Sequence, residues 1–324
     1  MTAKISLLGT GGTISTKPGE AGAVPGLAVA QIEAGLPKGP WQVKARDVMS
    51  KSSRSMSPAD MWHLALAVRE EIDAGANGVV ITHGTDTLEE TAYALALLVD
   101  PTIPVVITGA MRPPHALGAD GPANLHSALV VATRQELAPY GPVVVFQDEI
   151  HVARWVTKHQ SARVSAFTSP AAGPVGAIVE GQVHLTLGPA PQTDRLGADP
   201  VPPRHRVELL WTTAGSDGFL VQAVAGKVDG LVVAGTGGGH LPPLMAEELV
   251  ALVEDGSPVV LSSRCAGAPH VLTSTYGGVG SEVHLLRAGV LSGGSLAPLK
   301  CRLRLLFGLG AGLSAGELFP TTRP

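Results

Sequence analysis

The chain has only two cysteines, Cys265 and Cys301, among its 324 residues. They are far apart in the sequence and lack the paired spacing of a metal site, so we expect buried or incidental thiols rather than a disulfide. The 11 histidines contain no H-E-x-x-H or related pattern, which argues against a histidine-bound metal. The sequence therefore predicts that no metal takes part in the function.

Long apolar runs and basic clusters are also missing. No run approaches the length of a membrane span, and no apolar stretch of signal-peptide length follows Met1. The formal net charge of -4 comes without a basic run, which argues against a nucleic-acid-binding surface. From these absences we expect a soluble, cytoplasmic protein that binds neither nucleic acid nor membranes.

What the sequence does contain is a regular alternation of strand-like and helix-like segments. The helix expected at 57–74 begins with Ser57 as its cap, Pro58 at its first position and Asp60 three residues after the cap. Such alternation predicts parallel strands joined by right-handed crossovers, and hence an α/β fold. Further strands are expected at 78–82, 104–108, 142–146, 230–234 and 258–263, and further helices at 87–95, 244–254 and 299–308.

The length and a proline-rich segment indicate two domains. A chain of 324 residues with 45% hydrophobic residues and 40 glycines is too long for one typical core. The alternation stops in polar, proline-rich sequence between residues 189 and 206, which is typical of a linker. We therefore predict a larger N-terminal α/β domain with a mostly parallel sheet at 1–188, a linker at 189–206, and a smaller C-terminal α/β domain at 207–324.

A glycine-rich loop follows the first expected strand, residues 4–8. The loop is Gly9-Thr10-Gly11-Gly12-Thr13-Ile14-Ser15, and its glycines allow the positive φ and close backbone approach that ligand-binding turns need. The dinucleotide pattern G-x-G-x-x-G fails, because Ile14 stands at the third glycine position and no acidic residue ends a clear second strand about 20 residues later. We expect no nucleotide cofactor and favour a loop that holds a threonine nucleophile.

A second loop carries a hydroxyl and a carboxylate. The run His83-Gly84-Thr85-Asp86-Thr87 ends the apolar strand at 78–82 and opens the helix at 87–95. Thr87 and Glu90 have the spacing of a capping box. Thr85 and Asp86 are thus expected at the carboxyl end of a strand, where open α/β sheets bind their ligands.

These two loops resemble the bacterial L-asparaginase family, the threonine amidohydrolases. The resemblance spans nearly the whole chain, and the matching segments stand in the family's order: 10–14, 81–91, 108–113, 119–125 and 156–158. It implies a flavodoxin-like C-terminal domain, no cofactor, and hydrolysis of the side-chain amide of L-asparagine to L-aspartate and ammonia.

The resemblance also implies roles for particular residues. It assigns the nucleophile to Thr13 and makes Thr85, Asp86 and Lys158 its catalytic partners. A neutral lysine oriented by a carboxylate can accept a proton, so Thr85 would pass the proton on or activate the attacking water. Thr85 and Asp86 also bind the substrate in this scheme, and Ser53 matches the position that holds its α-carboxylate. How Thr13 and Thr85 divide the steps stays open.

Each of these residues also has an ordinary structural interpretation. A threonine such as Thr13 in a glycine-rich turn is usually a turn residue, and a carboxylate such as Asp86 is common at the start of a helix. Lys158 taken alone would be a solvated surface lysine. His83 is expected to be structural, and we assign no role to the polar groups of 115–120.

The chain departs from the family pattern at several positions. Residues 15–36 contain no tyrosine, although many asparaginases carry one there to close the site. Arg54 stands beside Ser53 where periplasmic members often have glutamine, and 235–240 lacks an asparagine found in some members. Glu282 lies where some members lend a glutamate to a neighbouring subunit's site, but its surroundings match poorly. These departures leave substrate affinity and glutaminase side activity open.

In the family, sites form between the large domain of one subunit and the small domain of another. We therefore expect a homodimer or homotetramer, with the glycine-rich C-terminal domain as the assembly platform. Two other functions remain: a different amidohydrolase or transamidation component that shares the fold, and a non-catalytic amino-acid sensor. The sensor is disfavoured because all the core residues are present.

Overall fold

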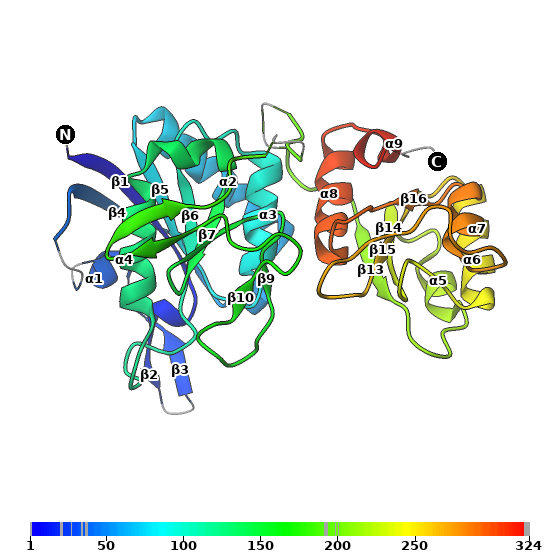
Figure 1. Ribbon diagram of the computed structural model, residues 1–324, viewed down its shortest axis with the longest axis horizontal. Coiled ribbons are helices and arrows are strands. Elements are labelled where there is room, and N and C mark those ends of the chain that lie inside the picture. Colours follow the sequence, from blue (N-terminus) through cyan, green and yellow to red (C-terminus); the bar gives the residue numbers. More distant parts are fainter. Residues whose placement is uncertain are drawn as a thin grey trace. The chain divides into compact units, whose positions relative to one another are not determined.

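The computed structural model describes residues 2–19, 22–26, 28–33, 35, 38–190, 194–197, 199 and 201–320. The chain divides into two compact units, residues 1–200 and 201–324 (Figure 1). Positions 191–193, 198 and 200 of the expected linker lie outside the described residues. None of the described helices is both long and apolar enough to cross a membrane.

The first unit is built on an eight-stranded sheet with the order β12-β11-β8-β7-β6-β5-β1-β4. Strands β4, β1, β5, β6 and β7 are parallel to one another, whereas β8, β11 and β12 add antiparallel pairs at the other edge. The expected mostly parallel sheet is therefore confirmed. The strands are β1 (Ala3–Gly11), β4 (Trp41–Lys51), β5 (Gly78–Thr82), β6 (Val105–Thr108), β7 (Val143–Phe146), β8 (Glu149–Val152), β11 (Gly176–Val179) and β12 (Gln182–Leu185).

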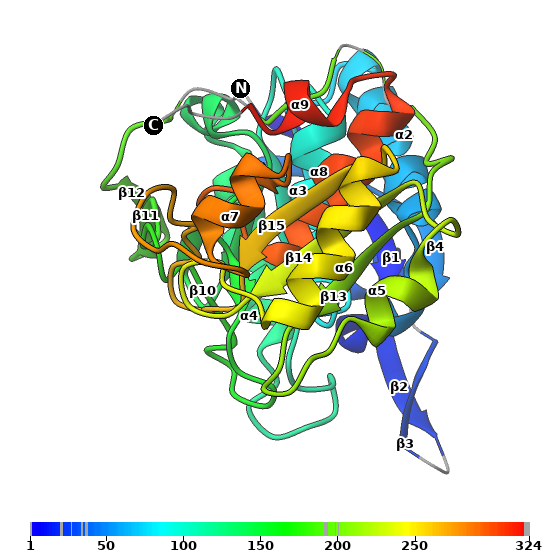
Figure 2. The ribbon, with the colours of Figure 1, turned by 90° about the vertical axis from the view of Figure 1, so that its right-hand side faces the viewer.

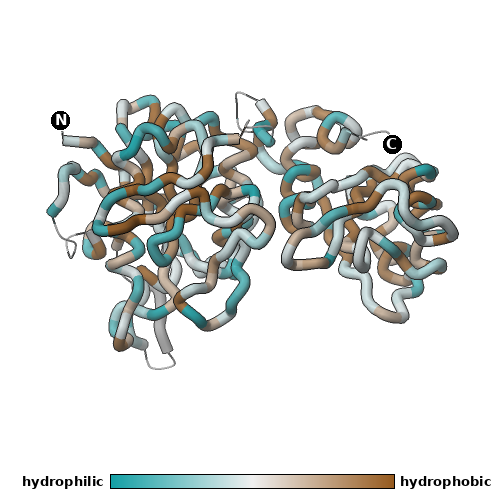
Figure 3. The backbone as a smooth tube through the Cα atoms, in the orientation of Figure 1, coloured by the Kyte–Doolittle hydropathy of each residue, from teal (hydrophilic) through white to brown (hydrophobic). Residues whose placement is uncertain are grey.

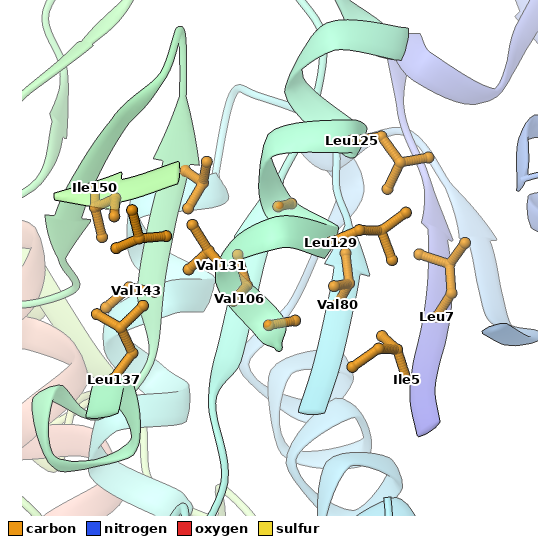
Figure 4. Packing of buried hydrophobic residues seen from close by; sticks show 14 of the residues in the cluster. Ile5, Leu7, Val80, Val106, Leu125, Leu129, Val131, Leu137, Val143 and Ile150 are labelled. Carbon is orange, nitrogen blue, oxygen red and sulfur yellow. The ribbon is translucent and has the colours of Figure 1, made fainter. Parts of the chain in front are cut away.

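Helices cover both faces of this sheet. Leu125 and Leu129 of α4 (Gly121–Ala132) pack against alternate strand residues, including Leu7 and Val80, in one buried cluster (Figure 4). The intervening strand residues point to the opposite face, because side chains alternate along a strand. There α2 (Pro58–Asp73) and α3 (Leu88–Leu98) lie side by side. Their buried side chains complete a three-layer α/β unit.

The two helix starts differ in how well the sequence predicted them. The capping box of Ser57 and Asp60 at the start of α2 is present, as expected. The capping box expected for Thr87 at the start of α3 is wrong, because the Thr87 side chain caps nothing. Its hydroxyl donates instead to the carbonyl of Ser53 at 2.9 Å. A tertiary contact has replaced the local one.

Short elements connect the main strands and helices of this unit. A hairpin of β2 (Thr16–Gly19) and β3 (Gly22–Pro25) extends away from the sheet (Figure 2). The remaining elements of this unit are η1 (Thr13–Ser15), α1 (Val29–Glu33), η2 (Ser53–Ser55), η3 (Gln135–Tyr140), and the antiparallel pair β9 (Thr157–Lys158) and β10 (Phe167–Thr168).

The second unit has a four-stranded, wholly parallel sheet with the order β13-β14-β15-β16. Helix α6 packs on one face with α5, and α8 contacts β13, β14 and β15. The strands and helices are β13 (Val207–Trp211), α5 (Phe219–Val224), β14 (Gly230–Gly235), α6 (Pro243–Glu254), β15 (Val259–Ser263), α7 (Glu282–Arg287), β16 (Leu291–Ser292), α8 (Pro298–Gly310) and α9 (Ala315–Leu318). Hydrophobic segments run through the interior of each unit, whereas hydrophilic ones lie mainly in outer loops (Figure 3).

Candidate active site

Two neighbouring parallel strands bring the two threonine loops together. Strands β1 and β5 are paired, with Gly9 opposite Thr82, so the loops that follow them leave the same edge of the sheet. Gly12 has a φ of 87°, and a Cβ there would lie 2.4 Å from the Cα of Gly84. Only a glycine accommodates both that φ and that contact. The two main chains therefore touch beside Thr13 and Thr85.

Thr13 begins the short helix η1 and is half-buried. The Thr16 hydroxyl donates to the Thr13 carbonyl at 2.7 Å, and the Ser15 amide donates to the Gly12 carbonyl at 3.0 Å. These bonds hold the main chain of the loop while leaving the Thr13 hydroxyl without a hydrogen bond to any described residue. Thr10 is instead buried, and its hydroxyl donates to the Thr82 carbonyl at 2.9 Å, as a turn residue would.

Lys158 joins the second loop through its side chain. Its Nζ donates to Thr85 Oγ1 at 2.9 Å and to Asp86 Oδ1 at 2.8 Å. The Lys158 side chain is only 15% exposed, whereas that of Asp86 is 58% exposed. A hydroxyl, an amine within hydrogen-bond reach and a carboxylate that orients the amine form the arrangement that activates a nucleophile or a water. The exposed carboxylate of Asp86 also remains accessible to a cationic ligand.

Ser53 reaches the same loop from the end of β4. It is buried in η2, where its Oγ accepts the Asp86 amide at 3.1 Å. A Cβ on Gly84 would lie 2.6 Å from this Oγ, so a larger residue at position 84 would push Ser53 away. Because Ser53 Oγ accepts from Asp86, its own proton is directed elsewhere. The structure thus brings together Ser53, Thr85, Asp86 and Lys158, with the loop of Thr13 against them.

His83 is fully buried behind these groups. Its Nδ1 lies 2.7 Å from the Gly84 carbonyl and its Nε2 lies 3.0 Å from Thr91 Oγ1. Burial lowers the pKa of His83 to about 4, against a smaller opposing effect of the bond to Gly84. The ring is therefore neutral near pH 7, with a proton on Nδ1 to donate to the carbonyl and with Nε2 accepting from Thr91. The expected structural role is confirmed.

The turn after β6 forms another wall of the site. Asp120 accepts the amides of Met111 and Arg112, both at 2.9 Å. Asn124 donates to the Gly109 carbonyl at 3.0 Å. A Cβ on Gly109 would lie 3.4 Å from Thr85 Cγ2, so this turn is packed directly on Thr85. The sequence prediction gave Asp120 no role, because nothing in its spacing shows that it caps a turn beside the site.

The sequence prediction also gave no role to Glu89. It is 8% exposed, and its Oε1 accepts the Lys158 amide at 3.1 Å and the Thr157 hydroxyl at 3.2 Å. The residue lies within the segment 81–91 that carries the family resemblance, which was the only available signal. Its partners follow it by almost seventy residues, so no local pattern links them.

Glu282 has a structural role within the second unit. Burial alone would raise the pKa of this fully buried carboxyl, but hydrogen bonds from the Tyr276 and Thr275 amides and the nearby His240 lower it. Both amides donate to Oε1 at 2.8 Å, and His240 Nε2 lies 3.1 Å from Oε2. The carboxylate therefore already has partners that hold the loop before α7. Among the described residues, no three His, Cys, Asp or Glu side chains gather as a metal site would require.

The segment 15–36 without tyrosine contains the β2–β3 hairpin and α1. Positions 20, 21, 27, 34 and 36 of this segment lie outside the described residues. Cys265 is exposed and Cys301 is buried, and neither forms a disulfide, as expected.

Comparison with known proteins covers both units. Residues 4–190 match the family model described as asparaginase, N-terminal, and residues 206–318 match the glutaminase/asparaginase C-terminal domain. A probable L-asparaginase of Deinococcus radiodurans is 36% identical over 328 residues, covering 97% of this chain and 95% of that protein. The crystal structure of a probable cytoplasmic L-asparaginase from Campylobacter jejuni has a TM-score of 0.85 at 31% identity, and the match covers 98% of both chains.

A third relative carries a different name. It is a component of the glutamyl-tRNA(Gln) amidotransferase of Halobacterium salinarum, 32% identical over 335 residues, and the match covers 94% of this chain and 75% of that protein. The two units of the present chain thus recur in proteins with more than one named activity.

Proposed function

Since the chain belongs to the asparaginase family, we propose that it hydrolyses the side-chain amide of L-asparagine to L-aspartate and ammonia at the site formed by Thr13, Thr85, Asp86 and Lys158. The observation that carries these residue assignments is the pair of hydrogen bonds from Lys158 Nζ to Thr85 Oγ1 and Asp86 Oδ1. This pair of bonds supports the proposal because an amine then lies within hydrogen-bond reach of a hydroxyl at the carboxyl end of a parallel strand, beside the loop of Thr13.

The proposed chemistry has two steps. In the first, the Thr13 hydroxyl attacks the amide carbon, its proton is transferred to the departing nitrogen, and ammonia leaves an aspartyl ester on Thr13. In the second, a water attacks the ester carbon, aspartate leaves, and the hydroxyl of Thr13 is restored. Thr85 and the amine of Lys158 take up and return the protons. Asp86 orients that amine through the bond of 2.8 Å.

The same groups explain how the substrate is held. The α-ammonium of asparagine binds the exposed carboxylate of Asp86, and its α-carboxylate accepts the Ser53 hydroxyl, whose oxygen already accepts the Asp86 amide. Thr85 is the third residue that binds the substrate. The oxyanion of each tetrahedral intermediate accepts main-chain N–H groups of the Gly84–Thr85 turn or of Ala110, which is buried beside it.

The test is ammonia release from L-asparagine, D-asparagine and L-glutamine at several concentrations. The wild type should turn over L-asparagine fastest, and Thr13→Ala and Thr85→Ala should each lower kcat by at least about 10³-fold, the scale of a lost nucleophilic group. Thr10→Ala is the matched control, because Thr10 shares the first loop but bonds the Thr82 carbonyl. Near-normal turnover by Thr13→Ala or Thr85→Ala, with an unchanged circular dichroism spectrum, would show that the replaced threonine takes no part in the mechanism.

The amidotransferase relative supports a second candidate function, the release of ammonia from another amide as a transamidation component. The same assay distinguishes the two functions. Fast release from L-glutamine with little from L-asparagine would favour the second candidate, and binding of either amino acid without any release would favour a sensor.

Three further assignments belong to this proposal. The protein assembles as a homodimer or homotetramer, as its family resemblance implies, and an active monomer in sedimentation would contradict this. The proposed domains are a catalytic domain at 1–188 and a C-terminal domain at 207–324, and the boundary between the two compact units falls within the proposed linker at 189–206. The location is cytoplasmic, in line with the name of the Campylobacter jejuni protein, and cell fractionation tests it.

A further inference from the structure

Lys158 stands on an unusually short support. Strand β9 contains only Thr157 and Lys158, and among the strands that the structure describes it pairs with β10 alone, where Phe167 lies opposite Lys158. Two residue pairs alone are a weak constraint on a main chain, because most sheet stability comes from longer ladders. Something else must hold the base in place.

The other side of β9 is held by the carboxylate of Glu89. Its Oε1 accepts the Lys158 amide at 3.1 Å and the Thr157 hydroxyl at 3.2 Å. Glu89 is 8% exposed, and a buried carboxylate is tolerated only when hydrogen bonds replace its water. Bonds to a charged acceptor are stronger than those between neutral groups. The contact is therefore more than incidental packing.

The position of Glu89 in the sequence links this contact to the loop of Thr85 and Asp86. Glu89 lies in the first turn of α3, directly after the loop that carries Thr85 and Asp86. The same helix start thus binds Lys158 at both ends, because Thr85 and Asp86 accept from Nζ while Glu89 accepts from the main-chain amide. A carboxylate there is also favoured by the helix dipole. Hydrogen bonds thus link the Thr85 hydroxyl, the Lys158 amine and the main chain of β9 to the start of one helix.

The geometry points to Glu89 as a positioning residue that fixes Lys158 for proton transfer by bonding its main chain; the catalytic part of this inference rests on the proposed function. Without Glu89, β9 keeps its pairing with β10 and the adjacent bond from the His159 amide to the Ala166 carbonyl, but the Lys158 amide loses its acceptor. The bond from Nζ to Thr85 Oγ1 then rests on a less firmly held main chain. Since a displacement of about 1 Å costs up to about 10²-fold in rate, Glu89→Ala should lower kcat by about 10- to 100-fold and leave KM nearly unchanged.

Two comparisons separate positioning from a general loss of structure. Glu89→Gln keeps a side-chain oxygen that accepts both bonds, so its kcat should lie within about 5-fold of wild type, given that the lost charge weakens but does not remove the bonds. In a Lys158→Met background, Glu89→Ala should lower kcat less than about 3-fold, because effects of residues that act through one another are not additive. The exposed Glu247 of α6 supplies the control variant Glu247→Ala.

A measurement without substrate keeps this inference separate from the proposed function. Hydrogen exchange of the peptide that contains β9 should be at least about 10-fold faster in Glu89→Ala than in wild type, and near wild type in Glu89→Gln. Unchanged exchange, or a full additional loss of kcat in the Lys158→Met background, would overturn the positioning role. If no amide is hydrolysed by the wild type, the proposed function fails while the exchange result still decides whether Glu89 holds the strand.

Discussion

Protonation of His83 should make the first unit unstable in mild acid. The ring is fully buried and neutral, with Nδ1 donating to the Gly84 carbonyl and Nε2 accepting from Thr91. A second proton would place a charge in a fully buried site and would turn Nε2 from an acceptor into a donor. His83 is thus a built-in acid-sensitive point directly behind Thr85.

The size of the effect follows from the two pKa values. Burial lowers the pKa from 6.5 in the unfolded chain to about 4 in the folded one. Between these values the unfolded chain binds more protons, so stability is complete above the unfolded pKa and falls as the pH drops toward the folded one. At about pH 5 the free energy of unfolding should be about 2 kcal/mol below its value at about pH 8, and the full loss is about 3 kcal/mol.

His151 is a second buried histidine with a pKa lowered to about 4 by burial. Its Nε2 lies 3.2 Å from Glu149 Oε2, however, and that carboxylate would stabilise the charged ring. His83 has no carboxylate partner of this kind among the described residues, which makes it the cleaner probe. Comparing wild type with a His83 variant cancels the contribution of His151 and of every carboxylate.

The suitable variant is His83→Asn, because the asparagine Nδ2 can still donate to the Gly84 carbonyl. It should be less stable than wild type at about pH 8 by about 1–3 kcal/mol, since it loses volume and the partner of Thr91. At about pH 5 the difference in free energy of unfolding between wild type and variant should be smaller by about 2 kcal/mol. Urea unfolding read by hydrogen-exchange mass spectrometry of 78–98 reports on this unit alone. If the free energies of unfolding of the two proteins change in parallel with pH, His83 is not the group whose protonation destabilises this unit.

Three further outcomes test the site and its frame. Lys158→Met should lower kcat by about 10²-fold or more while aspartate still binds. Lys158→Arg should also lose turnover, because a guanidinium stays protonated. Near-normal turnover by the arginine variant would mean that Lys158 acts only as a counter-ion for Asp86. Gly12→Ala should cost about 1–2 kcal/mol for its positive φ alone, and its clash with Gly84 should separate the loops, so thermal unfolding and kcat should both fall. Ser57→Ala should cost about 0.5–2 kcal/mol by loss of a helix cap, with kcat unchanged, and a variant as stable as wild type would show that the cap contributes nothing.

The framework of this protein can be read from local stretches of its chain. Apolar runs bounded by turn residues predicted the strand at 78–82 and the helix at 57–74, because burial and capping depend on residues close together in the chain. The family segments identified Thr13, Thr85, Asp86 and Lys158. The placement of Thr85 and Asp86 at the carboxyl end of a strand needed only local reasoning, since the motif directly follows the apolar run.

How these groups meet, and what holds them, depends on the packing of the whole unit. Thr87 has the spacing of a cap but bonds the Ser53 carbonyl, because η2 arrives beside it from β4. Lys158 lies on a strand of two residues, too short to leave any periodic signal. Its partners Thr85 and Glu89 are separated from it by 73 and 69 residues. Hydrogen bonds across such distances depend on how the β9–β10 pair, which lies outside the eight-stranded sheet, packs against the start of α3. No single stretch of sequence encodes that packing.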